Sequence, residues 1–260
     1  MLKTLENRIA LITGASKGIG RATALEFAKQ GAAVGLVARS KDKLEECVEE
    51  ITAMGGKAYY CKADLCNREE TLNSIREIEN KLGPINILVN NAGNNILGHF
   101  LEQSEEQWRN QIELGLMAPY LLSRAVLPGM IKQKFGRIIN IASINAKKSG
   151  KFISAYATAK HGLIGLTRSL AIDFAAAGVT VNAICPGWVE TPLTKSTLHQ
   201  RSELFGKSKE EITKFALALI PQGEIMQADE IVPLILFIAQ NGSHRITGQA
   251  INICGGRVMH

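Results

Sequence analysis

The 260-residue sequence lacks the marks of several protein classes. Its five cysteines form no C-x-x-C pair and do not cluster with the five histidines, so we expect reduced cysteines and no metal site. Aromatic residues are 5% of the chain and its 30 basic residues are mixed with 24 acidic ones, which argues against nucleic-acid binding. No apolar run reaches the roughly 18–20 residues of a membrane span, and the N-terminus has no apolar secretory segment. These absences predict a cytoplasmic protein without a nucleic-acid or membrane partner.

What the sequence does contain is a regular alternation of strand-length apolar runs and helical patterns. The expected strands cover 8–13, 33–38, 58–61, 85–89, 137–142, 179–184 and 250–253. Helices are expected over 19–29, 41–54, 68–82, 105–132 and 155–176, the fourth interrupted by Gly115 and Pro119. Nearly continuous apolar strands are typical of a parallel sheet covered by helices on both faces. We therefore predict an α/β fold, with a single domain over 1–260 built on a Rossmann-type doubly wound parallel sheet of about seven strands.

The segment 193–219 breaks this alternation, because it is helical and charged and follows the sixth expected strand. Ligands of open α/β sheets bind beyond the carboxyl ends of the strands. We therefore expect this insertion to be a helical lid over a substrate. A packed helical hairpin without contact to a ligand is the alternative.

Three glycines follow the first expected strand, in the sequence from Thr13 to Gly20. Gly14 permits a sharp turn, Gly18 lets the backbone approach a pyrophosphate, and Gly20 allows close packing of helix on sheet. The helix that begins here carries partial positive charge at its N-terminus, which favours phosphate. The pattern predicts a dinucleotide-binding turn.

The end of the second expected strand indicates which dinucleotide binds. An acidic residue at this point holds the ribose 2′-hydroxyl of NAD, whereas an arginine accommodates the 2′-phosphate of NADP. The strand ends in Arg39 and Ser40 with no carboxylate, and Lys17 in the glycine turn offers a second cation. We therefore predict NADP(H) as the cofactor.

Tyr156 and Lys160 are four residues apart in a helical segment, so they share one helix face. An unperturbed tyrosine has a pKa of about 10, and a neighbouring cation lowers that pKa by favouring the phenolate. Ser143 ends the fifth expected strand, on the same carboxyl edge as the glycine turn. These residue types in this arrangement indicate a proton-transfer site.

Together these motifs resemble the short-chain dehydrogenase/reductase family over essentially the full chain, and within it the 3-oxoacyl reductases and ketoreductases. Further matching motifs are Asp64-Leu65, the run from Asn90 to Gly93, Pro186-Gly187, Thr191-Pro192 and the run from Ile246 to Gln249. The resemblance implies that Tyr156 is the general acid in ketone reduction and that Ser143 polarises the carbonyl. It implies that Lys160 lowers the pKa of Tyr156 and holds the nicotinamide ribose.

The residues and the resemblance together give a set of expected ligand contacts. The expected cofactor-binding residues are Gly14, Ser16, Lys17, Gly18, Ile19, Gly20, Arg39, Ser40, Asp64, Leu65, Asn91, Ala92, Gly93, Tyr156, Lys160, Pro186, Gly187, Val189 and Thr191. The expected substrate contacts are Ser143, Asn145, Tyr156 and Trp188, with Asn94, Asn95, Phe152 and Leu193 near the mouth of the site.

The expected reaction is the NADPH-dependent reduction of a ketone to a secondary alcohol, with a 3-oxoacyl thioester or a related small carbonyl compound as substrate. One alternative is the NAD(P)-dependent oxidation of a small secondary alcohol, 3-hydroxy acid or sugar alcohol. Another is a non-catalytic NADP-binding sensor. The resemblance also implies a homotetramer or homodimer, assembled through the helices that begin near Glu105 and Ala155.

One position departs from the family pattern. Seven residues after Trp108, where the family usually carries an asparagine that supports a proton-relaying water, this chain has Gly115. Glycine inside a helix costs about 1 kcal/mol relative to alanine, so we do not expect it to be there for stability. Asn110 is more than a helical turn away and is expected to be a poor substitute. We expect activity to survive, since Ser143, Tyr156 and Lys160 are all present.

Overall fold

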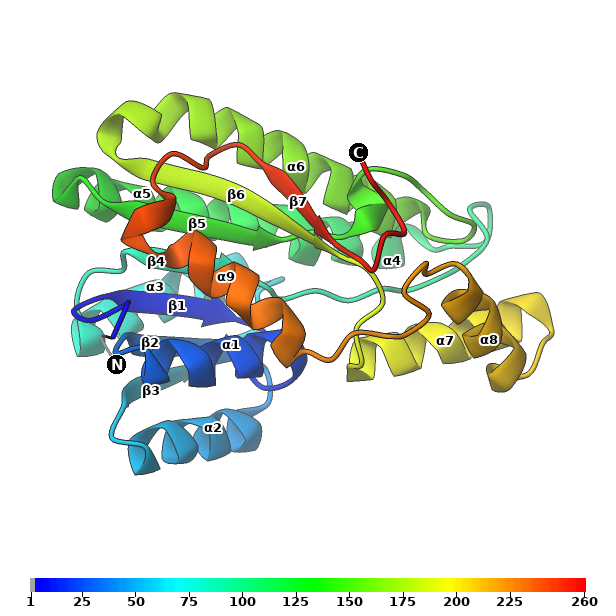
Figure 1. Ribbon diagram of the computed structural model, residues 1–260, viewed down its shortest axis with the longest axis horizontal. Helices are drawn as coiled ribbons and strands as arrows, with labels where there is room; N and C mark the ends of the chain where they lie inside the picture. The colour runs from blue at the N-terminus through cyan, green and yellow to red at the C-terminus, as the bar shows by residue number, and fades with distance from the viewer. Residues whose placement is uncertain (1–2) are drawn as a thin grey trace.

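The computed structural model describes residues 3–260, and its seven strands form one parallel sheet (Figure 1). The strands are β1 (Ile9–Thr13), β2 (Ala33–Ala38), β3 (Lys57–Lys62), β4 (Ile87–Asn90), β5 (Gly136–Ile141), β6 (Val179–Pro186) and β7 (Ala250–Ile253). They lie in the order β3-β2-β1-β4-β5-β6-β7, and every neighbouring pair is parallel. The predicted Rossmann-type sheet is thus confirmed. The strand order reverses between β1 and β4, which is where such sheets bind ligands.

Helices cover both faces of the sheet. One face carries α1 (Gly18–Lys29), α2 (Lys41–Ala53) and α9 (Val232–Ala239); the other carries α3 (Arg68–Leu82), α5 (Ala118–Gln133) and α6 (Ser154–Phe174). Two further helices, α7 (Pro192–Phe205) and α8 (Lys209–Ala218), lie beyond the carboxyl end of β6 and project away from the sheet (Figure 1).

The two faces of the sheet bury separate apolar cores. Phe27 of α1 and Ile51 of α2 pack in the first, and Ile78 of α3 and Met130 of α5 pack in the second. All four side chains are fully buried, and burying a side chain of this size stabilises the fold by about 1.5–3 kcal/mol. Every residue of β5 and β6 is buried, which explains why their sequences are mostly apolar.

Three helical segments follow one another without a break between β4 and β5. They are α4 (Glu105–Ile112), the π-helical turn η1 (Glu113–Met117) and α5. By length and composition the whole stretch, Glu105–Gln133, is apolar enough to cross a membrane, but 50% of its most apolar window is buried inside the fold. Leu122, Val126 and Met130 belong to the core, so we assign the stretch to the body of the protein.

The expected element boundaries hold to within a few residues, with three differences. The segment 193–219 is two helices, because the chain turns at Gly206 with a φ of +61°. The helical stretch 105–132 is not broken at Gly115 or Pro119: Gly115 lies in η1, and Pro119 lies in α5 directly after η1. The third difference is β4, which begins two residues later than expected.

Candidate active site

A cavity of about 1110 Å³ lies at the carboxyl edge of the sheet. It is lined by the segments that follow β1 through β6 and by residues of α7 and α8. Drug-sized ligands occupy pockets of about 300–1,000 Å³, so this cavity is large enough for a dinucleotide and a small second molecule. Of the expected cofactor and substrate residues, all but Gly20 line it.

The glycine turn has the conformation that its glycines were expected to allow. Gly14 and Gly18 have φ angles of +64° and +56°, in the left-handed region that side chains disfavour. A Cβ atom on Gly14 would lie 2.8 Å from Nδ2 of Asn91. A Cβ atom on Gly20 would lie 2.5 Å from the carbonyl oxygen of Gly14, so Gly20 is needed for packing and not for ligand contact.

Hydrogen bonds hold the segment after β4 against the end of β1. The hydroxyl of Thr13 accepts from the backbone N–H groups of Asn91 (2.9 Å) and Ala92 (3.0 Å). The side-chain amide of Asn91 donates to the carbonyl oxygen of Thr13 at 2.8 Å. The Asn91 side chain is therefore turned toward the protein, and what it presents to the cavity is chiefly backbone.

The charges of the cavity wall are strongly unbalanced. Asp64 is the only carboxylate in the lining among residues 3–260, and its Oδ1 accepts from the backbone N–H of Cys66 at 3.0 Å. The cationic side chains in the lining are Lys17, Arg39, Lys148, Lys151, Lys160, Arg201, Lys207 and Arg257. Such a wall attracts anionic ligands.

Ser143, Tyr156 and Lys160 meet at the centre of the cavity. Ser143 lies two residues beyond the end of β5, and its Oγ accepts from the backbone N–H of Asn145 at 3.0 Å. Tyr156 and Lys160 are one turn apart on α6, with Nζ of Lys160 5.9 Å from the centroid of the Tyr156 ring. The Lys160 Nζ donates to the carbonyl oxygen of Ile141 at 2.7 Å and the side chain is buried.

Burial is the main influence on the pKa values of Tyr156 and Lys160. It raises the pKa of the Tyr156 phenol above the ordinary value, and the hydrogen bond with Ser143 opposes this only in part. Burial lowers the pKa of Lys160 to about 8. The Lys160 ammonium is directed to the Ile141 carbonyl, and the expectation that Lys160 lowers the pKa of Tyr156 stays a prediction.

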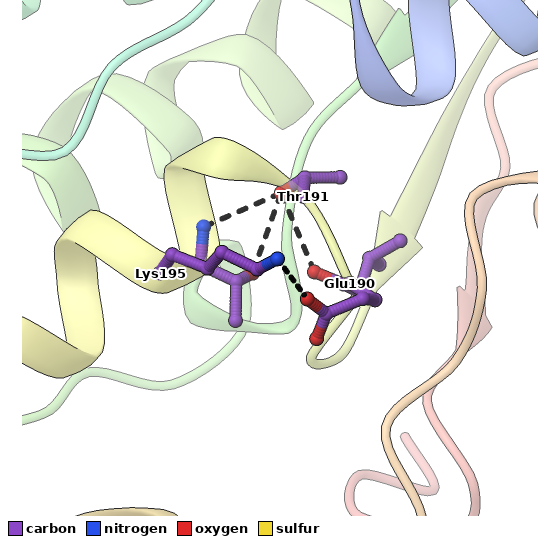
Figure 2. A network of polar contacts seen from close by, with 5 residues as sticks. Glu190, Thr191 and Lys195 are labelled. Carbon is purple, nitrogen blue, oxygen red and sulfur yellow. Dashed lines mark hydrogen bonds and ion pairs between the residues drawn. The ribbon is translucent and has the colours of Figure 1, made fainter. Parts of the chain in front are cut away.

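Thr191 caps α7 beside the glycine turn (Figure 2). Its hydroxyl accepts from the backbone N–H of Thr194 at 3.3 Å, and Lys195 forms an ion pair with Glu190 at 3.0 Å. A Cβ atom on Gly18 would lie 3.0 Å from Cγ2 of Thr191. The start of α7 is therefore fixed directly against the predicted pyrophosphate turn.

Gly115 has a packing role that the sequence did not reveal. A Cβ atom there would lie 2.9 Å from Cβ of Ala159 on α6, so the close approach of the two helices requires glycine. Gly115 does not line the cavity, whereas Asn110 does. The expectation that Gly115 is not there for stability is thus corrected, because its contact with α6 leaves no room for a side chain. The expectation that Asn110 is a poor substitute stays a prediction.

Three of the four side chains expected near the mouth of the site lie in the cavity wall. Asn94, Asn95 and Leu193 line the cavity, but Phe152 does not; its ring packs edge-on against Phe205, with centroids 5.2 Å apart. Five cationic side chains of the lining were not identified from the sequence: Lys148, Lys151, Arg201, Lys207 and Arg257. None of them belongs to a local motif, and the only available signal was that Arg201 and Lys207 lie within the expected lid.

Comparison with known proteins agrees with this fold. The family model described as short chain dehydrogenase matches residues 8–202. Subunit BbsD of hydroxy(phenyl)methylsuccinyl-CoA dehydrogenase from Thauera aromatica is 37% identical, with 97% of each chain covered. The 3-oxoacyl-acyl-carrier-protein reductase FabG of Thermotoga maritima is 35% identical, with 98% of this chain and 99% of that one covered. The chain belongs to the short-chain dehydrogenase family of oxidoreductases.

Among solved structures, a variant of actinorhodin polyketide ketoreductase with NADPH superposes with a TM-score of 0.93 at 33% identity, with 99% of each chain covered. A putative NAD(P)-dependent gluconate 5-dehydrogenase from Beutenbergia cavernae with bound NADP gives a TM-score of 0.89 at 34% identity, again with 99% of each chain covered. Both similar structures are of NADP- or NADPH-bound enzymes of this architecture.

Proposed function

We propose that this chain reduces a ketone to a secondary alcohol with NADPH. The observation that carries the proposal is that Ser143, Tyr156 and Lys160 line one cavity together with the glycine turn and Arg39. A 3-oxoacyl thioester or a related small carbonyl compound is the proposed substrate class, which is supported by the relatives named as ketoacyl or 3-oxoacyl reductases.

The site residues divide the chemistry between them. When bound, NADPH supplies the hydride that reaches the carbonyl carbon. Ser143 already accepts a hydrogen bond from the Asn145 N–H, so its own hydroxyl proton is available to polarise the substrate oxygen. Tyr156 then gives its phenolic proton to that oxygen, and Lys160 directs its ammonium into the same space while it is held by the Ile141 carbonyl.

Tyr156 serves either direction of the reaction: its phenol gives a proton to the substrate oxygen in reduction and takes one back in alcohol oxidation. The raised pKa of Tyr156, caused by burial, therefore does not choose between the two directions. Reduction is favoured by the relatives named as ketoacyl or 3-oxoacyl reductases.

The residues around the glycine turn fit an NADP(H) molecule. We assign the 2′-phosphate to Lys17, Arg39 and Ser40, and the adenine to Asp64 and Leu65. The remaining contacts in the proposal come from Ser16, Ile19, Asn91, Ala92, Gly93, Pro186, Gly187, Val189 and Thr191, all in the cavity wall. No carboxylate follows β2 to repel a phosphate, which supports NADPH over NADH.

We further propose that residues 1–260 act as one domain in which α7 and α8 form the substrate lid. Leu193, Arg201 and Ile212 of these helices line the cavity, which a hairpin packed elsewhere would not do. A homodimer or homotetramer is proposed through α5 and α6; Ile172 of α6 is an apolar side chain that is 82% exposed in the single chain. The five free cysteines fit a reducing compartment, and we propose the cytoplasm.

The test is a panel of ketones offered to the purified protein with NADPH and, separately, with NADH, while the nicotinamide absorbance is followed. We expect oxidation of NADPH by at least one 3-oxoacyl thioester or small ketone, and slower reaction with NADH. Binding of NADPH without turnover on any ketone would instead favour the non-catalytic sensor.

A further inference from the structure

Two arginines in the cavity wall have no counter-ion. Arg201 lies on α7 and Arg257 lies in the segment after β7, and both line the cavity. Within residues 3–260, neither forms an ion pair with a carboxylate. The Nε atoms of both are buried without a hydrogen-bond partner.

Trp188 brings the two arginines together. The guanidinium carbon of each lies 5.8 Å from the centroid of the Trp188 ring. Two backbone hydrogen bonds fix the chain around Trp188. The N–H of Gly187 donates to the carbonyl oxygen of Ile253 (2.9 Å), and the N–H of Met226 donates to the carbonyl oxygen of Trp188 (3.2 Å). The two arginines and the tryptophan thus come from three segments: α7, the chain after β7 and the chain after β6.

The electrostatics of the pair are unfavourable without a ligand. Burial lowers the pKa of both Arg201 and Arg257, and the charge of Arg257 lowers the pKa of Arg201 further. Burial, and after it the charge of Arg257, also lowers the pKa of Lys148, a third cation of the same cavity. Partly buried like charges are costly unless an anion compensates them.

The cofactor's phosphates are not placed to be that anion. Thr191, at the start of α7, lies against the glycine turn, and Arg201 follows it by ten residues of the same helix, about 15 Å along the axis. Asp64, the only carboxylate of the lining among the described residues, is near Arg39 and Cys66 at the glycine-turn end. The compensating anion must therefore arrive with the second ligand.

We propose that Arg201 and Arg257 bind a free carboxylate of the substrate, so that the ketone reduced by this chain is an oxo acid. This inference rests on the proposed reductase function. A guanidinium matches a carboxylate with two parallel hydrogen bonds, and the Trp188 ring offers an apolar surface for the carbon chain between the carboxylate and the ketone.

The first test compares matched substrates in which a methyl ester replaces the free carboxylate: acetoacetate against methyl acetoacetate, and levulinate against methyl levulinate. The ratio of kcat/KM for the acid to that for the ester is measured for the wild type, Arg201→Met and Arg257→Met. We expect each substitution to lower this ratio by roughly 10- to 100-fold through KM. Arg245→Met, which removes one exposed arginine outside the cavity, is the matched control and keeps the wild-type ratio.

Acetoacetyl-CoA is included because its phosphates are another source of negative charge. If the substitutions impair only the coenzyme A ester, the anion is a phosphate and the carboxylate assignment is wrong. If the acid-to-ester ratio is the same in all the proteins, the arginines do not bind substrate and the inference is overturned.

A binding measurement separates this inference from the proposed reaction. In a Trp108→Phe background Trp188 is the sole tryptophan, so malonate, which cannot be reduced, is titrated against its fluorescence. We expect a saturable change whose Kd rises at least tenfold in Arg257→Met. Malonate binding without reduction of any ketone would refute the reductase function and leave the arginine site standing; no arginine-dependent response to malonate would refute the site.

Discussion

The two ends of the cavity are built in different ways. At the glycine-turn end, polar groups are paired within the protein: the Thr13 hydroxyl bonds two backbone N–H groups, and the Asn91 amide bonds a carbonyl. At the α7 end, Arg201 and Arg257 have buried nitrogen atoms without partners. At the first end, two motifs that are each local in sequence pair their polar groups with one another, whereas at the second end two cationic side chains lack partners and call for a ligand.

The largest effect is expected between the two ends, at Tyr156. Tyr156→Phe removes the proton donor while the ring still fills its place, so we expect kcat for ketone reduction to fall by roughly 10²- to 10⁴-fold. NADPH binding, followed by its fluorescence, should remain. Tyr120→Phe, which removes a hydroxyl from α5 outside the cavity, is the control. Wild-type reduction by Tyr156→Phe would remove the basis of the proposed mechanism.

A substitution of Arg39 tests whether this residue makes the glycine-turn end select NADPH over NADH. Arg39→Asp places a carboxylate where the 2′-phosphate is proposed to lie. We expect the KM for NADPH to rise by roughly 10- to 100-fold, since charge-assisted hydrogen bonds are lost and repulsion is added. The KM for NADH should not rise, because NADH has no 2′-phosphate. An equal loss for both cofactors would mean that Arg39 supports the fold and not the choice of cofactor.

The comparison of the two ends also explains what the sequence could predict. Apolar runs and caps are local, so α3 was predicted with its observed bounds and β2 likewise. The start of β4 was predicted two residues early, because Ile85 extends the apolar run beyond the strand. Between Ile85 and the strand, the Asn86 side chain accepts from the N–H of Ile9 at 2.8 Å. The cofactor motifs are local in the same sense, and the residues they indicated all lie at the cavity except Gly20.

The parts that the sequence could not predict depend on contacts between distant segments. Arg201 and Arg257 are 56 positions apart, and the guanidinium of each lies beside the Trp188 ring. The need for glycine at position 115 arises from Ala159 on another helix, and the raised pKa of Tyr156 arises from burial. No pattern within a short window carries any of these properties.

The pH dependence of reduction tests the buried pair on α6. The pKa of Lys160 is lowered to about 8, so its amine is charged below that pH and neutral above it. The pKa of Tyr156 is raised, so its proton is lost only at higher pH. We expect kcat/KM for reduction to be level from pH 6 to about 7.5 and to fall up to tenfold per pH unit above about 8. A profile that stays level beyond pH 10 would show that the charge of Lys160 is not needed.

The smallest effect is expected at Gly115, which lies outside the cavity and tests the packing of η1 against α6. Gly115→Asn restores the side chain that the family usually carries but forces a Cβ atom to 2.9 Å from Cβ of Ala159. We expect the free energy of unfolding to fall by about 1–3 kcal/mol from overpacking, measured by urea denaturation. Gly129→Asn is the matched control, because a Cβ atom there meets nothing within 4 Å, so this change should be neutral or slightly stabilising.

The double variant Gly115→Asn with Ala159→Gly removes the contact and should recover part of the loss. If Gly115→Asn is as stable as Gly129→Asn, the helices can move apart, and the absence of asparagine at this position has no packing cause.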